Sequence, residues 1–127
     1  MEAGRLKLLL CGKKVVNDEA LKTLLRIKYD IICIKDFRKL MDILFHEVVK
    51  LIIFDISKKR NEQLKILIEL KEKLPDVIVV AVNGSENVQN AAEILAAGAT
   101  DVFPKPYDSK LLAERVNGLL KEKTEIM

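Results

Sequence analysis

The sequence has few of the residues that metal and redox sites require. Its 127 residues include two cysteines, Cys11 and Cys33, and one histidine, His46. The cysteines lie in separate apolar runs, at a spacing that fits no zinc or thiol–disulfide motif, so we expect both to be reduced core residues. His46 lies in a helical pattern with no second ligand or catalytic partner. This excludes Ser–His–Asp and Cys–His catalytic sets and argues against a zinc site.

Other absences concern nucleotides, membranes and nucleic acids. After the first apolar run the chain reads Gly12-Lys13-Lys14-Val15, which is neither a GxGxxG motif nor a Walker loop. No apolar run approaches the roughly 20 residues of a membrane helix, and the first residues lack a signal-peptide cleavage site. The net charge of +3 is too small to indicate nucleic-acid binding by itself. We therefore expect a cytoplasmic protein that binds neither membranes nor, directly, nucleic acid.

The length and composition are those of one globular domain. Half of the residues are hydrophobic and 32% are charged, which is an ordinary balance for a chain that buries one core. We expect residues 1–127 to form a single domain with its core at about 5–121. Residues 122–127 are expected to be a charged tail or the start of a linker.

Short apolar runs alternate with segments of helical periodicity along the chain. The runs predict strands at 6–11, 31–34, 51–54, 77–82 and 102–103. The periodic segments predict helices within 18–28, 36–48, 62–74, 86–97 and 109–120. This alternation predicts an α/β fold, a doubly wound three-layer sandwich of helices on both faces of a parallel sheet.

The pattern also predicts how the helices begin, end and pack. Asn17 or Asp18 is the expected N-cap of the first helix, Asp36 that of the second, and Gly98 the expected C-cap of the fourth. The second helix is expected to bury a stripe that ends at Val48. The inward faces predicted for the last two helices are Val88, Ala91, Ala92, Leu95 and Ala96, and Leu111, Leu112, Val116, Leu119 and Leu120.

The strand at 51–54 is apolar on both faces and is followed by Asp55. Such strands lie at the centre of parallel sheets, and ligands bind at the carboxyl ends of those strands. A carboxylate in this place is suited to chemistry, although a helix N-cap or a plain strand-end residue has the same pattern.

Two more polar residues, Asn83 and Lys105, also follow predicted strands. A carboxylate nucleophile, an amide donor and a lysine that neutralises charge together suit a phosphoryl group. The Lys105-Pro106 bond can be cis, which would aim the lysine inward. Asn83 could instead be only a turn residue, because it precedes Gly84.

These segments resemble the CheY-like receiver domain of response regulators in two-component signalling. The resemblance covers about residues 5–121, and its most specific parts are 51–55, 96–101 and 105–107. It implies a flavodoxin-like fold with five parallel strands in the order 2-1-3-4-5. It also implies that Asp55 is the phospho-acceptor, that Asn83 and Lys105 contact the phosphoryl group, and that the backbone carbonyl of Ser57 is a metal ligand.

The sequence departs from the family pattern where the family holds its Mg²⁺. The family has two adjacent acidic residues at the end of the first strand, and this chain has Cys11-Gly12 or Gly12-Lys13 there. Because Mg²⁺ requires several oxygen ligands, we expect no metal, or only weak binding at Asp55, and no other cofactor. Val102 replaces the family's switch aromatic, and Phe103 is expected on the opposite face of its strand.

Basic residues are expected around Asp55 instead of acidic ones. Lys13, Lys14 and Lys105 follow strands, and the loop after Asp55 adds Lys58, Lys59 and Arg60. One of these lysines could pair with Asp55 and lock the domain in one state. The basic rim could instead bind an anion, such as a phosphorylated partner, an acidic protein face or a nucleotide, or it could be solvated and without a role.

The resemblance implies a regulatory domain that is not an enzyme. Its expected partners are a sensor histidine kinase or an effector domain, with a homodimer formed through helix 86–97, strand 102–103 and helix 109–120. We expect an atypical receiver that acts as a protein-interaction module. The alternatives are a working receiver phosphorylated at Asp55 by a histidine kinase and, less favoured, a flavodoxin-like nucleotide or small-ligand binder.

Overall fold

A computed structural model describes residues 4–56, 60–83 and 88–125 of the chain. The strands are β1 (Lys7–Cys11), β2 (Asp30–Ile34), β3 (Leu51–Ile56), β4 (Ile78–Asn83) and β5 (Asp101–Pro104). The helices are α1 (Lys13–Val16), α2 (Glu19–Arg26), the 3-10 turn η1 (Phe37–Lys39), α3 (Leu40–His46), α4 (Arg60–Lys73), α5 (Val88–Ala97) and α6 (Ser109–Glu125).

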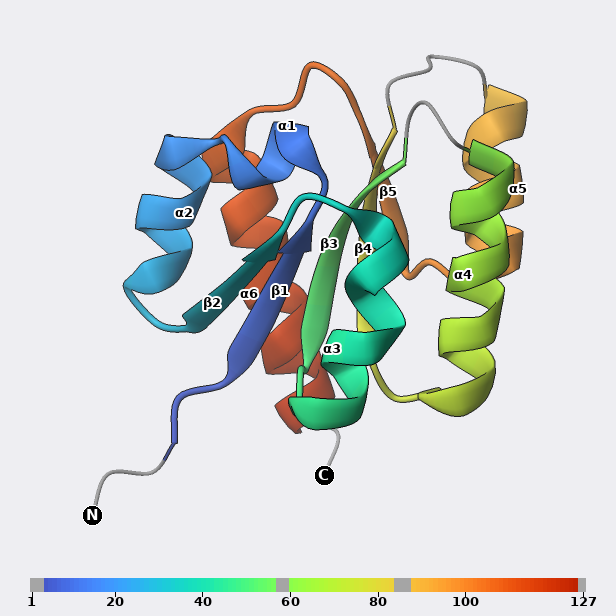
Figure 1. Cartoon of the computed structure of the whole chain (residues 1–127). Helices are drawn as coiled ribbons and strands as arrows, with labels where there is room; N and C mark the ends of the chain where they lie inside the picture. Colours follow the sequence, from blue (N-terminus) through green and yellow to red (C-terminus); the bar gives the residue numbers. More distant parts are fainter. Residues whose placement is uncertain (1–3, 57–59, 84–87, 126–127) are drawn as a thin grey trace.

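The strands form one parallel sheet in the order β2-β1-β3-β4-β5 (Figure 1). The chain moves from β1 outward to β2 and then returns to the other side of β1 with β3, so the strand order reverses between β1 and β3. Cys11 lies beside Phe54 in the register of β1 and β3, and Asp55 lies beside Val82 in that of β3 and β4. The predicted fold class and strand order are confirmed.

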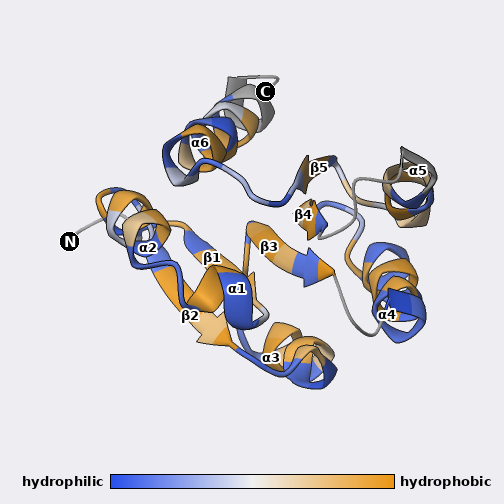
Figure 2. Ribbon diagram, turned by 90° about the horizontal axis from the view of Figure 1, so that it is seen from above, coloured by the Kyte–Doolittle hydropathy of each residue, from blue (hydrophilic) through white to orange (hydrophobic). Residues whose placement is uncertain are grey.

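Helices cover both faces of the sheet, so β3 and β4 are buried at every position. Figure 2 shows α2 and α6 on one side of the strands and α3, α4 and α5 on the other. Alternate strand residues enter the two cores because successive side chains point to opposite faces. The α2–α6 core includes Leu8, Leu10, Ile53, Val80, Leu21, Leu25, Leu112 and Val116, and the opposite core includes Leu9, Ile52, Phe54, Val79, Leu40, Leu67 and Ile94. Phe103 packs on the first core and Val102 on the second, which confirms that they face opposite ways.

The connection from β1 to α2 contains a helical turn that the sequence pattern did not predict. Gly12 has a φ of 113°, which turns the chain directly after β1. The turn α1 then buries Val15 and Val16. Asp18, one of the two predicted N-caps, accepts a hydrogen bond of 2.9 Å from the backbone N–H of Leu21 and so caps α2.

Two predicted core residues are exposed because of where their elements lie. Val48 was expected in a helical stripe, but α3 ends at His46 and the Val48 side chain is 77% exposed, while Val49 is buried. Cys33 was expected in the core, but β2 is an edge strand and the free Cys33 thiol is exposed. Cys11, on the central strand β1, is free and buried as predicted.

The predicted inward faces of the last two helices are corrected in part. Among the α5 residues whose burial the structure describes, Ile94 is fully buried, whereas Leu95 is 46% exposed and Ala92 and Ala96 are exposed. In α6 Leu111 is 58% exposed, whereas Leu112, Val116, Leu119 and Leu120 are buried as predicted. Gly98 ends α5 with a φ of 125°, in agreement with a glycine C-cap. Within the described ranges, no helix has both the length and the apolar character needed to cross a membrane.

Substitutions at Ile94 and Leu95 test the orientation of α5. Ile94→Ala should reduce the free energy of unfolding by about 2–5 kcal/mol, because it leaves a cavity between α5 and the sheet. Leu95→Ala is the matched control and should change it by about 0.5 kcal/mol, because this side chain is largely in solvent. Urea unfolding followed by circular dichroism measures both values, and equal losses would contradict this orientation.

Candidate functional site

Asp55 lies buried near the carboxyl end of β3, and its side chain is held by two other parts of the chain. The Lys105 ammonium lies 2.5 Å from Asp55 Oδ1 and forms an ion pair with it. The backbone N–H of Lys14 donates to Asp55 Oδ2 at 3.3 Å. Each carboxylate oxygen therefore already has a donor from the chain itself.

The backbone of Asp55 is also anchored. The side-chain amide of Gln63, a buried residue of α4, donates to the Asp55 carbonyl at 3.0 Å. Sequence reasoning missed Gln63 because it looks like one polar residue among several on a surface helix. Its burial follows only from the packing of α4 over the end of β3.

Lys105 reaches Asp55 from the loop between β5 and α6. Its backbone N–H donates to the carbonyl of Asn83 at 3.0 Å, and the Lys105-Pro106 peptide bond is cis. Asn83 is buried at the end of β4, but the register partner of Asp55 on that strand is Val82. The Lys105 side chain thus contacts Asp55, and the backbone of Asn83 helps to position Lys105. The contacts of the Asn83 and Lys105 side chains with a phosphoryl group stay predictions.

Gly12 is the residue of the first loop that lies against Asp55. A Cβ atom at this position would lie 2.5 Å from Asp55 Cβ and 3.2 Å from Asp55 Oδ2, and the φ of 113° disfavours any side chain. Of the three candidate positions for the family's acidic pair, Cys11 is buried in the core and Lys13 is exposed. A side chain at position 12, a carboxylate included, is therefore strained by both contact and conformation.

The donor set around Asp55 does not fit Mg²⁺. This ion requires near-octahedral oxygen ligands. No cluster of three or more acidic, histidine or cysteine residues suited to a metal occurs in residues 4–56, 60–83 and 88–125. The Asp55 oxygens accept from an ammonium and an amide, and Gly12 offers no side chain. The predicted carbonyl ligand, Ser57, lies outside the described residues.

The thiol of Cys11 is not an alternative ligand or nucleophile. Burial, with smaller contributions from the negative charges of Asp55 and Asp36, raises the pKa of the Cys11 thiol to about 12. A thiol must lose its proton to attack or to bind a metal. Cys11 therefore stays protonated at neutral pH and acts as a core residue.

The predicted basic rim is only partly gathered at the site. Lys13 and Lys14 have exposed side chains, and Arg60 forms a salt bridge with Glu93 that joins α4 to α5. Lys58 and Lys59 lie outside the described residues. Among the rim cations that the structure describes, Lys105 is the one paired with Asp55.

A second polar cluster next to the site was not predicted as a unit. Asp18 Oδ2 accepts from the Tyr107 hydroxyl at 2.8 Å and from the Ser109 hydroxyl at 2.7 Å, which fastens the loop after Lys105 to the start of α2. Burial, followed by hydrogen bonding to Asp18, raises the pKa of Tyr107, so this hydroxyl stays protonated and donates. No local spacing signals this cluster, because about 90 residues separate its two sides.

Comparison with known proteins agrees with this geometry. Residues 9–117 match the model of the response regulator receiver domain. The chain belongs to this family. It is a receiver domain of two-component signalling, and the resemblance seen in its sequence is confirmed.

Individual relatives of this receiver domain are distant. The response regulator MprA of Mycolicibacterium vanbaalenii is 24% identical over 96 residues, which are 76% of this chain and 42% of MprA. The chain thus spans less than half the length of this relative. Two solved structures share the fold. A CheY-like receiver domain protein of Methanospirillum hungatei has a TM-score of 0.85 at 20% identity, covering 98% of this chain and 100% of its own. The BeF3-activated receiver domain of DrrB, from Thermotoga maritima, has a TM-score of 0.80 at 17% identity, with coverages of 92% and 98%.

Two glycine substitutions with opposite expected signs test the contact between Gly12 and Asp55. Gly12→Ala should lower the free energy of unfolding by about 1–3 kcal/mol, because alanine must adopt a positive φ and displace Asp55. Gly118→Ala is the control within α6, where a Cβ meets nothing within 4 Å, and it should raise stability by about 0.5–1 kcal/mol. Denaturant unfolding measures the change in unfolding free energy for both variants. If Gly12→Ala left this free energy unchanged, Asp55 would not approach residue 12 as described.

The Asp18 cluster predicts an effect of pH on stability. Burial alone would raise the pKa of Asp18, but hydrogen bonds from Leu21, Ser109 and Tyr107 outweigh it and lower the pKa below its ordinary value. A depressed folded-state pKa gives stability that is present above the unfolded value of about 4 and is lost as pH falls through the folded value. As the pH is lowered from 7 into the acid range, the free energy of unfolding should therefore decrease more steeply for the wild type than for Asp18→Asn. The asparagine keeps an oxygen that can cap α2. Parallel curves would contradict the assignment.

Proposed function

We propose that this receiver domain is atypical and acts as a regulatory protein-interaction module, not as an enzyme, without Mg²⁺-dependent phosphorylation of Asp55. The observation that carries the proposal is the state of the Asp55 carboxylate. Lys105 occupies one oxygen, the Lys14 amide donates to the other, and Gly12 lies where an acidic side chain would have to be.

The chemistry of acyl phosphate formation supports this reading. A carboxylate oxygen must attack phosphorus, and a cation must neutralise the charge on donor and acceptor. A bound metal ion can neutralise this charge and can then leave the site. The Lys105 ammonium cannot leave, because it is part of the chain, and it lies largely buried beside Asp55. The ion pair weakens Asp55 Oδ1 as a nucleophile, and the missing acidic pair removes the metal that would compete for the carboxylate.

The partners proposed for this module are the usual ones of receiver domains. Such domains act through sensor kinases and effector domains, and MprA is long enough to carry a further region beyond the matched part. Leu95 of α5 and Leu111 of α6 are large apolar side chains exposed on the helices that flank β5. These exposed side chains support the face formed by α5, β5 and α6 as a partner surface for a kinase or effector domain.

A second candidate is a receiver that is still phosphorylated at Asp55. The approach of Lys105 to Asp55 at the carboxyl edge of the sheet favours it, because a lysine in this place can also neutralise a phosphoryl group. In this case Lys105 would have to release Asp55 Oδ1 before the reaction and bind the phosphoryl group afterwards.

Exposure to a phosphoryl analogue separates the two candidates. The atypical receiver should show no change in its ¹H–¹⁵N spectrum, for the amides of residues 12–14 and 105, on addition of beryllofluoride and Mg²⁺ together. The DrrB receiver, whose solved structure is BeF3-activated, is the positive control under the same conditions, and Asp55→Asn is the negative one. A change in the wild type that Asp55→Asn abolishes would establish the second candidate.

A further inference from the structure

The connection from β1 to α2 contacts the candidate site at two separate points. Near its start, the backbone N–H of Lys14 donates to Asp55 Oδ2 at 3.3 Å. At its end, Asp18 Oδ2 accepts a hydrogen bond of 2.8 Å from the Tyr107 hydroxyl. Figure 1 shows the loop that carries Tyr107, in orange, passing from β5 toward α1 and α2. One short segment therefore contacts both the Asp55 carboxylate and the loop that supplies Lys105.

These contacts form a closed circle around the site. Lys105 pairs with Asp55, and Tyr107, farther along the same loop, donates to Asp18. Lys14, which precedes Asp18 in the connection, returns to Asp55 through its backbone amide. Burial and the hydrogen bond to Asp18 raise the pKa of Tyr107 most, and the charge of Asp55 adds to them. The Tyr107 hydroxyl therefore lies close enough to Asp55 to sense its charge.

The acceptor in this circle, Asp18, is itself held by the core and by α2. Val15 and Val16 of α1, just before it, are buried. Its other carboxylate oxygen, Oδ1, accepts from the backbone N–H of Leu21 at 2.9 Å. Because interiors are closely packed, a residue anchored on both sides in this way gives the Tyr107 hydroxyl a fixed point of attachment.

The position of the Lys105 backbone affects how completely Asp55 is paired. A lysine reaches its partner through a flexible side chain, so the ion pair is favoured only where the backbone is held at a suitable place. On the β4 side, the Lys105 N–H donates to the Asn83 carbonyl at 3.0 Å. On the α6 side, the Tyr107 hydroxyl ties the same loop to Asp18. Loss of this second attachment should let the Lys105 ammonium leave Asp55 more often.

We propose that Tyr107 and Asp18 are positioning residues for the Lys105–Asp55 ion pair. Their hydrogen bond fastens the loop between β5 and α6 to the start of α2 and keeps the Lys105 ammonium on the carboxylate. Through this bond, the start of α2 influences how completely Asp55 is paired. The inference deepens the proposed function, because it rests on the same ion pair. It requires nothing about phosphorylation, so its test and the beryllofluoride experiment can fail separately.

Acetylation of lysine side chains with acetic anhydride tests the proposal on the whole chain. Only an amine that has left its ion pair can attack the reagent. The rate at Lys105, measured by mass spectrometry relative to the exposed Lys50, therefore measures release from Asp55. Tyr107→Phe keeps the aromatic side chain and removes the hydroxyl. It should raise this relative rate at least about threefold, a shift that corresponds to the loss of one ordinary hydrogen bond.

Tyr29→Phe is the matched control. It removes another tyrosine hydroxyl, which donates to Asn117 Oδ1 of α6 at 2.5 Å and lies outside the Lys105 loop. This variant should leave the relative rate at Lys105 unchanged, and circular dichroism confirms that each variant is folded. The proposal is overturned if Tyr107→Phe leaves the rate unchanged, or if Tyr29→Phe raises it as much, because equal effects would indicate a general loosening of the packing.

Asp18→Asn tests whether the two residues act through one bond. Asparagine keeps an oxygen for the Leu21 amide and places an amino group toward the Tyr107 hydroxyl, so the relative rate at Lys105 should rise here as well. The double variant D18N/Y107F should react no faster than the faster single variant, because the hydrogen bond between the two side chains can be lost only once. Effects that multiply in the double variant would contradict the shared role.

Discussion

A carboxylate that is almost withdrawn from water must be neutralised, and the structure around Asp55 follows from that requirement. Here Lys105 neutralises the charge, and the Lys14 amide satisfies the second oxygen. Gly12 makes this possible, because only a residue without a side chain lets the first loop approach Asp55 so closely.

The backbone of the loop that carries Lys105 is held at several points. The Asn83 carbonyl binds the Lys105 backbone, and Asp18 binds the Tyr107 and Ser109 hydroxyls on the far side of the cis peptide bond. Movement of the Lys105 backbone away from β3 would have to disturb contacts to β4 and to α2 as well.

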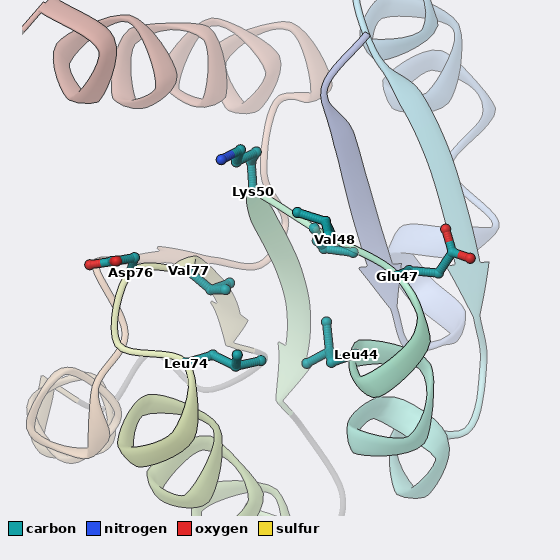
Figure 3. A pocket seen from close by; sticks show the side chains of 8 residues that line it. Leu44, Glu47, Val48, Lys50, Leu74, Asp76 and Val77 are labelled. Carbon is teal, nitrogen blue, oxygen red and sulfur yellow. The ribbon is translucent and has the colours of Figure 1, made fainter. Parts of the chain in front are cut away.

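The two ends of the sheet have different chemistry. At the carboxyl edge, charged groups are buried and paired around Asp55. At the amino edge, the exposed side chain of Val48 borders a recess with apolar walls (Figure 3).

The sequence by itself determined the alternation of strands and main helices, the sheet class, and the positions of Asp55, Asn83 and Lys105 at or near strand ends, because periodicity is a local property. It narrowed the N-cap of α2 to Asn17 or Asp18, and it placed a cap at Asp36, which caps the 3-10 turn before α3. It gave the period of the last two helices but not their full orientation. Ile94 and not Leu95 is buried, because the side of a helix that faces inward depends on the sheet it packs against. Only the tertiary structure decided that Cys33 lies on an edge strand, that Val48 lies beyond its helix, and that Gly12 contacts Asp55. These outcomes depend on contacts between segments far apart in the chain, and no local pattern of residues encodes them.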